Sequence, residues 1–287
     1  MKLYQKILRR LISHPSTAIE HIRKLTKRHK VVCPVCGVIG AHRHIHNTDK
    51  RGIRTYHCQE CKQFYSELKG SVFYRSKIPL HKWMQAILEW TLSTGSISAA
   101  ELSRRLDIKH DSALRMVHAI QGKLLQSLNT SQLKDVVEAD EAWFGKKQNQ
   151  HIICGFVERG SRKLRLDIIP NVKEKTLYPL VEQHVKRGST FCTDSRISYS
   201  SAGIYYKHRT TNHSKGEFAR AGIIHSNTIE QIWGDIKGII RTIHHGISKK
   251  YRHLYLAQYI FKYENLHSSN LFTYTLVNLI SPMFPGI

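Results

Sequence analysis

The sequence predicts a mixed α/β (α+β) protein in which a cysteine module and a helical segment precede a larger domain of strands and helices. Three observations lead to this prediction. Four cysteines form two close pairs near the amino terminus, residues 78–128 have helical periodicity, and short strand-like apolar runs begin near residue 134. A chain of 287 residues has room for two domains and a small additional module.

The charge of the chain indicates a polyanionic partner. It has 45 Lys and Arg residues against 21 Asp and Glu residues, for a formal net charge of +24. The first 82 residues hold 18 basic and 4 acidic side chains. Nucleic acid is the partner that this balance favours, and an anionic membrane surface is the alternative. Hydrophobic residues make up 41%, which argues against wholesale disorder.

The first 30 residues predict a basic helical arm. Apolar residues recur at helical spacing in KLYQKILRRLI. The segment lacks the apolar core of a signal peptide, and the alternative to an arm lying on phosphates is an Arg-rich transit peptide. No run approaches the roughly 18 apolar residues that a membrane helix needs, so we expect no membrane partner.

Residues 31–77 predict a zinc ribbon. The two C-x2-C pairs are Cys33 with Cys36 and Cys58 with Cys61. Four thiolates close a tetrahedral site, so the predicted zinc is structural. The 21 residues between the pairs slightly exceed the usual spacing of roughly 15–20, which a hairpin or loop would accommodate.

Other interpretations of the cysteine module stay open. One is a redox pair with two additional cysteines. Nearby histidines are competing ligands or face nucleic acid or solvent, and these are His42, His44, His46 and His57. Cys154 and Cys192 lie in apolar surroundings and read as buried thiols. This cysteine usage is typical of a reducing compartment and predicts a cytoplasmic protein.

Residues 78–132 predict a helix-turn-helix domain. Ser98 is placed to cap one helix, with Glu101 as its capping-box partner. The next helix carries Arg115 and His118, and a second helix of this kind enters the DNA major groove. The alternative is a helical bundle that only links the two halves of the chain.

The carboxyl-terminal part alternates strand and helix patterns. Predicted strands are DVVEADEAWFG, HIICGFVE, KLRLDIIP and STFCTDS. Predicted helices are KEKTLYPLVEQHVKRG, which ends at Gly188, SNTIEQIWGDIKGIIRTI and YRHLYLAQYIFKYENL. The apolar tail from Leu271 packs either on the core or on a partner subunit.

Three acidic residues are the candidate catalytic ligands. Asp140 and Asp194 sit in or at the end of strand-like runs, where Asp is disfavoured, and Glu230 begins a predicted helix. Three such carboxylates can hold two Mg²⁺ ions, which favour few carboxylates together with substrate phosphate.

Residues near these acids have different expected roles. Lys237 follows Glu230 by seven positions, so both lie on one helix face and the lysine can reach a phosphate. Glu138 shares the strand face of Asp140 and is a neighbour of the site, whereas Glu141 points away and is solvated or paired. We expect Asp235 at the surface.

Six blocks in order resemble DDE-type insertion-sequence transposases that carry an amino-terminal zinc ribbon, over about residues 31–266. The blocks are CPVCG with CQECKQFYS, SVFYRSKIPLHKWMQAI, ELSRRLDIKHDSALRMVHAI, EADEAWFGKK, TDS, and HSNTIEQIWGDIKGIIRTIHHGISKKYRHLYLAQYIFKY. In this resemblance Asp140, Asp194 and Glu230 match the catalytic acids, and Lys237 follows the third. The family varies near that third position, so Asn227 is a candidate to share it. YENLH departs from the family's usual ending.

The resemblance implies an RNase H-like catalytic domain, which we place at residues 133–287. It implies a Mg²⁺- or Mn²⁺-dependent DNA transposase that binds terminal inverted repeats, cleaves DNA and joins strands. Its partners would be double-stranded DNA, as element ends and target, and further copies of the chain in a homodimer or larger assembly at the nucleoid. Two other hypotheses remain: a DNA-binding regulator with a degenerate catalytic domain, and an RNase H-like nuclease that only cuts.

Overall fold

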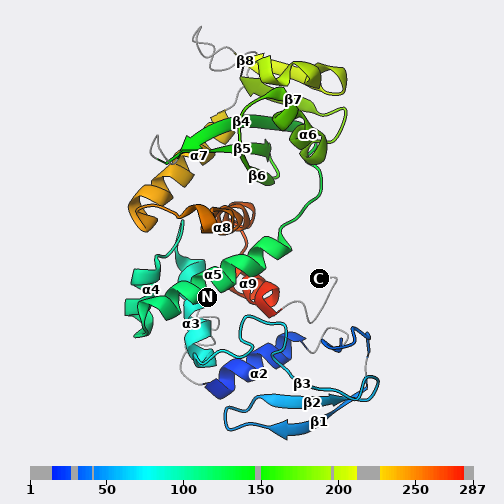
Figure 1. Ribbon diagram of the computed structural model, residues 1–287, viewed down its shortest axis with the longest axis vertical. Coiled ribbons are helices and arrows are strands. Elements are labelled where there is room, and N and C mark those ends of the chain that lie inside the picture. The colour runs from blue at the N-terminus through cyan, green and yellow to red at the C-terminus, as the bar shows by residue number, and fades with distance from the viewer. Residues whose placement is uncertain are drawn as a thin grey trace. The chain divides into compact units, whose positions relative to one another are not determined.

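The structure, a computed structural model, describes residues 15–26, 32–40, 42–145, 150–194, 197–211 and 227–280 (Figure 1). The predicted helix in KLYQKILRRLI lies outside the described residues. The chain divides into two compact units. The first unit contains the described residues up to Ser127 together with the last helix, and the second contains Leu128–His267.

The first unit begins with a helix and a three-stranded antiparallel sheet. The elements are α2 (Pro15–Thr26), β1 (Arg43–Thr48), β2 (Arg54–Cys58) and β3 (Phe64–Ser66), with the strands in the order β1-β2-β3. The residues between the two cysteine pairs thus form the β1–β2 hairpin.

Helix α2, which lies within the predicted basic helical arm of residues 1–30, packs into this unit. Its Ala18, Ile19 and Ile22 are buried. Arg23 pairs with the buried Glu67 carboxylate, with Nη2 and Oε1 2.7 Å apart. The segment expected to lie on phosphates therefore uses one of its arginines to join α2 to the chain beyond β3.

Four helices complete the first unit: α3 (Leu80–Leu92), α4 (Ala99–Leu106), α5 (His110–Ser127) and α9 (Leu271–Ile280). The Ser98 side chain accepts a hydrogen bond from the Glu101 N–H at 3.1 Å, so it caps α4 as expected. The Glu101 carboxylate pairs with Arg104 and Arg105 instead of completing the capping box. Asp107 adopts a left-handed conformation that ends α4 before α5 begins.

The apolar tail from Leu271 forms helix α9. Phe272, Leu276 and Leu279 are buried, and α9 packs against α3 and α5. The tail therefore belongs with the helical part of the first unit, whereas the sequence placed it in a catalytic domain that extended to residue 287. In the part of the chain that the structure describes, no helix combines the length and apolarity needed to cross a membrane.

The second unit is built on a five-stranded mixed sheet. Its strands are β4 (Val136–Phe144), β5 (His151–Glu158), β6 (Leu164–Ile169), β7 (Thr190–Asp194) and β8 (Lys207–Thr211), in the order β6-β5-β4-β7-β8. The pairs β4–β5 and β5–β6 are antiparallel, and β4–β7 and β7–β8 are parallel. The four predicted strands are present. β8 was not anticipated because KHRTT is polar and short.

The helical elements of this unit are α6 (Glu174–His184), η2 (Ile197–Ile204), α7 (Asn227–Ile239), the π-turn η4 (Ile240–His244), η5 (Lys249–Tyr251) and α8 (Arg252–Glu264). Helix α6 ends at His184, whereas the sequence predicted Gly188. The reason is a short parallel bridge between Leu133 and Val185. The Leu133 N–H donates to the His184 carbonyl at 2.7 Å, which takes the chain out of the helix.

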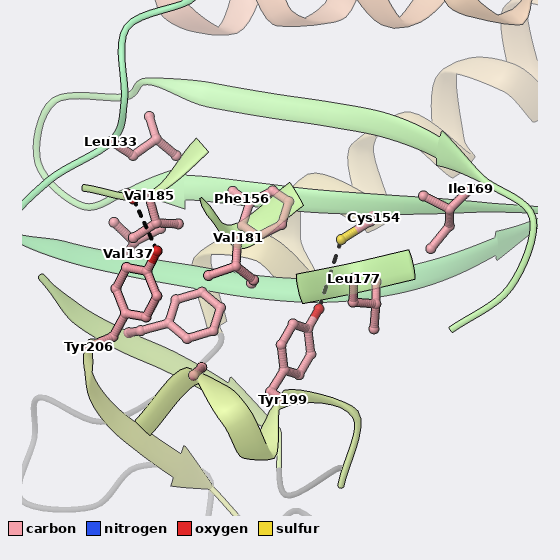
Figure 2. Close-up of a cluster of buried hydrophobic side chains, with 13 residues drawn as sticks. Leu133, Val137, Cys154, Phe156, Ile169, Leu177, Val181, Val185, Tyr199 and Tyr206 are labelled. Atoms are coloured by element: carbon pink, nitrogen blue, oxygen red, sulfur yellow. Dashed lines mark hydrogen bonds between the residues drawn. The ribbon is translucent and has the colours of Figure 1, made fainter. Parts of the chain in front are cut away.

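Both faces of the sheet are covered. On one face, Val137, Cys154 and Phe156 pack against Leu177 and Val181 of α6 (Figure 2). The other face packs against α7 and α8 through Ala142, Phe144, Ile153, Trp233 and Ile260. This alternation is the period-2 pattern of a strand buried on both sides. The mixed sheet between helices confirms the predicted mixed α/β class.

Candidate active site and cysteine cluster

The central strand β4 presents carboxylates to both faces of the sheet. Glu138 and Asp140 face α7 because they differ by two positions, and Glu141 faces the opposite core. Glu141 is buried and accepts a hydrogen bond from the Tyr199 hydroxyl (4% of its surface is exposed). Of the two expectations for Glu141, the structure therefore shows the paired one.

Glu138 anchors the start of α7. Its carboxylate is fully buried and accepts hydrogen bonds from the backbone N–H groups of Thr228 at 2.9 Å and Ile229 at 3.1 Å. The Thr228 hydroxyl and the Arg159 guanidinium also donate to it. The first N–H groups of a helix lack partners within the helix and carry partial positive charge, so a carboxylate there stabilises and orients α7.

Trp233 makes a second connection between α7 and β4. Its indole Nε1 donates to Oδ2 of Asp140 at 3.0 Å. Gly155 is paired with Asp140 across β4 and β5. A Cβ at Gly155 would lie 2.6 Å from the Trp233 ring and 2.9 Å from Ile229. The missing side chain of Gly155 therefore lets the indole lie on the sheet and reach Asp140.

These two connections bring Asp140, Glu230 and Lys237 to one open pocket. The pocket has a volume of about 450 Å³ and is lined by these three residues with Glu141, Ala142, Trp143, Trp233 and Gly234. Asp140 is half-buried, and Glu230 and Lys237 are exposed. The Lys237 ammonium lies 5.7 Å from the centre of the Phe144 ring. The pocket thus combines two carboxylates and a cation at the surface of the sheet.

Asp194 is held by the neighbouring strand. The β4–β7 pairing runs from Val136 with Thr190 to Glu138 with Cys192, and Asp140 and Asp194 each follow the last pair by two positions. Asp194 is the last residue of β7, whereas Asp140 is the middle residue of the longer β4. Asp194 is half-buried and is not among the residues that line the pocket of Asp140 and Glu230.

Two other residues considered from the sequence lie apart from the pocket. Asn227 is the exposed first residue of α7, and it is not a lining residue. Asp235 is exposed as expected, and its carboxylate accepts a hydrogen bond from the Tyr259 hydroxyl at 3.3 Å. The sequence identified Glu138 only as a neighbour and gave no role to Gly155 or Trp233. The available signals were the two positions between Glu138 and Asp140 along the strand and the three positions between Glu230 and Trp233 along the helix.

The four cysteines of the first unit converge. The Sγ atoms of Cys33, Cys36, Cys58 and Cys61 all lie within 4.8 Å of one another. Those of Cys33 and Cys61 are 3.8 Å apart. Tetrahedral zinc with Zn–S bonds of roughly 2.3 Å requires sulfurs about 3.8 Å apart, so the donor set and its spacing fit zinc. Within the described ranges, no other such group of three or more Cys, His, Asp or Glu residues occurs.

The backbone around the cluster favours thiolate formation at one of the cysteines. The N–H of Cys61 donates to the Cys58 sulfur and lowers the pKa of Cys58 to about 7. Buried Tyr56 and Tyr65 pack with the cysteines in a small core. His44 is engaged with Gln59 through Nδ1 at 2.7 Å, and none of the four nearby histidines joins the sulfur cluster. Cys154 and Cys192 are buried in the second unit as expected.

One family model matches a stretch within the second unit. Residues 132–264 match the model of the ISXO2-like transposase domain. No curated protein matches the chain significantly in sequence.

Solved structures similar to the chain include integrases. One is the catalytic core domain of BIV integrase, at 14% identity and a TM-score of 0.31, covering 44% of this chain and 81% of that one. Another is the HTLV-2 integrase catalytic core domain in complex with magnesium, at 10% identity and a TM-score of 0.32, covering 47% and 88%. A third is a simian T-cell lymphotropic virus intasome, at 13% identity and a TM-score of 0.34, covering 62% and 68%. The match to the ISXO2-like transposase domain model covers fewer than half of the 287 residues, and the matched stretch contains the mixed five-stranded sheet with α6, α7 and α8.

Proposed function

We propose that this protein is an insertion-sequence DNA transposase in which Asp140, Asp194 and Glu230 form the catalytic site. The observation that carries the proposal is the pocket shared by Asp140, Glu230 and Lys237 within the transposase domain. The register of β4 and β7 adds Asp194 at the adjacent strand end. This is a set of hard oxygen ligands open to a large polyanionic substrate, as Mg²⁺ or Mn²⁺ sites require.

In this proposal some residues hold the metal ions, and others contact the substrate or orient a metal ligand. Two metal ions bound by the carboxylates would activate the attacking oxygen and stabilise the leaving oxygen of a phosphodiester. Lys237 contacts a substrate phosphate next to the carboxylates, since it lies two helical turns from Glu230 on the same pocket wall. Trp233 orients the Asp140 carboxylate through its Oδ2 atom. Asp140 therefore presents its other oxygen in a fixed direction.

Recognition of the terminal inverted repeats is assigned to the first unit. The start of α5 exposes Lys109, His110 and Arg115 beyond the left-handed turn at Asp107. A recognition helix contacts base edges with residues of this kind at its amino-terminal end. The cysteine cluster binds structural zinc and holds the ribbon together.

The proposal also covers the assembly of the protein on DNA, its partner and its location. Joining two element ends to a target favours a homodimer or larger assembly on DNA. The net charge of +24 favours double-stranded DNA over a neutral partner. Binding to DNA would give the protein a nucleoid-associated location in the cytoplasm.

The test is metal-dependent cleavage and joining with matched variants. The purified chain is incubated with Mg²⁺ and a duplex that carries an element end and its flank. Asp140→Asn keeps the size of the side chain and removes its charge. Asp235→Asn makes the same change at an exposed position of α7 outside the pocket.

We expect cleaved and joined products from the natural chain and from Asp235→Asn, and none from Asp140→Asn. Full activity of Asp140→Asn would refute the assignment. Cleavage without joining would instead indicate a nuclease, and specific binding without any product would indicate a regulator.

A further inference from the structure

One face of the zinc ribbon carries a continuous row of four rings. Ring centroids lie 5.0 Å apart for His44 and His57, 4.7 Å for His57 and Phe64, and 4.5 Å for Phe64 and His46. The row crosses all three strands, since His44 pairs with His57 and His57 pairs with Phe64 in the sheet. The rings are tilted by 45° to 52° relative to one another.

This row lies opposite the metal side of the sheet. Tyr56, Cys58 and Tyr65 alternate with His57 and Phe64 along β2 and β3, and these three are buried in the small core around the cysteines. The ring row is not part of that core. His44 and His46 are exposed, and 54% of the Phe64 surface is accessible. The exposed phenyl ring and the adjacent imidazoles therefore have ring faces that a ligand can contact.

The surroundings of the row are basic. Residues 31–82 hold 9 basic and 3 acidic side chains. Two of the three acids are already paired, Asp49 with Arg51 and Glu67 with Arg23. Exposed Lys50 and Lys62 lie in the turns at the two ends of β2. Exposed rings within a basic field complement a ligand that has both flat apolar faces and negative charge.

We propose that the ring row of His44, His46, His57 and Phe64 is a stacking platform for unpaired bases of single-stranded DNA. The proposal deepens the transposase function, on which it rests, by giving the ribbon a ligand beyond the duplex of the element end. In a duplex, the base faces are covered by neighbouring pairs and only the edges are accessible. Unpaired bases expose their faces, and these stack on aromatic side chains while the backbone follows a basic groove.

The platform makes a specific prediction for Phe64. Each base stacked on an aromatic side chain contributes enough that removal of the ring weakens binding about 5- to 150-fold. Phe64→Ala should therefore weaken binding of single-stranded DNA by this factor, and Phe64→Leu should do so too because leucine is apolar but has no ring. Phe64→Tyr should restore binding.

The experiment uses the full chain, loaded with zinc, and a fluorescein-labelled oligothymidylate of about 12 nucleotides, within the site sizes of single-strand binders. Fluorescence anisotropy is measured at moderate salt, which suppresses non-specific phosphate contacts of other basic segments. A hairpin duplex of equal length is the second probe. Ile45→Ala is the matched control, since Ile45 is 47% exposed in the same sheet and pairs with the buried Tyr56.

The proposal predicts that Phe64→Ala and Phe64→Leu lose affinity for the oligothymidylate, while Ile45→Ala and Phe64→Tyr keep it, all with unchanged zinc content. Unchanged affinity of Phe64→Ala would overturn it. Equal losses on the hairpin and the single strand would also overturn it, because they would show a duplex contact. Asp140→Asn should bind the oligothymidylate normally, so failure of the catalytic assignment and failure of the platform are distinguishable.

Discussion

Gly155→Ala is a sharp test of how the sheet holds α7 over Asp140. The added Cβ would lie 2.6 and 2.8 Å from two atoms of the Trp233 ring and 2.9 Å from Ile229. Carbon atoms in good contact are about 3.5–4.0 Å apart, so the overlap is about 1 Å. Gly155 lies in β5, between β4 and β6, which prevents the backbone from yielding.

The magnitude follows from this overlap. Overpacking of a core by one methyl group costs about 1–3 kcal/mol of unfolding free energy. For a unit of this size, the loss corresponds to a melting temperature lower by roughly 4–12 °C. Displacement of the indole also breaks its hydrogen bond to Asp140, so the proposed metal-dependent activity should fall more than stability alone explains.

Differential scanning calorimetry of the full chain measures the effect. Gly238→Ala in α7 is the control, because a Cβ there meets nothing within 4 Å. Alanine is the better helix former by roughly 1 kcal/mol, so this variant should melt at the same or a higher temperature. Gly155→Ala combined with Trp233→Phe should recover part of the lost stability, since phenylalanine lacks the clashing ring atoms.

A Gly155→Ala protein that melts like the natural chain would refute this account. The same is true of a double variant that shows no recovery relative to the sum of its single changes. Either result would mean that the indole does not depend on the space above Gly155.

Three other predictions follow from the cysteine cluster, the charge and a half-buried histidine. Chelation, or Cys58→Ser, should release one zinc ion per chain and unfold the ribbon as monitored by circular dichroism, while Cys192→Ala should keep the zinc. Duplex affinity measured by anisotropy should fall steeply and log-linearly with salt, and a flat response between low and moderate salt would contradict the electrostatic role of the first 82 residues. Burial and the charge of His245 lower the pKa of His244 to about 4. An unfolded histidine binds its proton near pH 6.5, so the unfolding free energy should fall as pH decreases from about 6.5 toward 4, and His244→Phe should flatten this fall in urea titrations.

Local patterns in the sequence predicted much of the fold and selected three of the residues that line the candidate site. The cysteine spacing, the strand of Asp140 and the seven-residue offset from Glu230 to Lys237 each depend on one short segment. The structure places Asp140, Glu230 and Lys237 at one pocket and gathers the four cysteines.

The parts that escaped prediction depend on contacts between distant segments. Glu138 anchors Thr228, which is 90 positions away, and Trp233 needs the space above Gly155. A polar strand such as β8 forms because β7 supplies its hydrogen bonds. The apolar tail had two plausible destinations, and only the packing of α9 on α3 and α5 distinguishes them.

Strand transfer by Glu230→Gln tests the central claim most directly. A pre-cleaved element end is mixed with a plasmid target, Mg²⁺ and either the natural chain or the variant, so that joining is measured without the preceding cleavage. The account predicts joined product from the natural chain and none from Glu230→Gln, with equal binding of the end by both proteins. Joined product from Glu230→Gln at the natural rate would contradict a catalytic site formed by Asp140, Asp194 and Glu230.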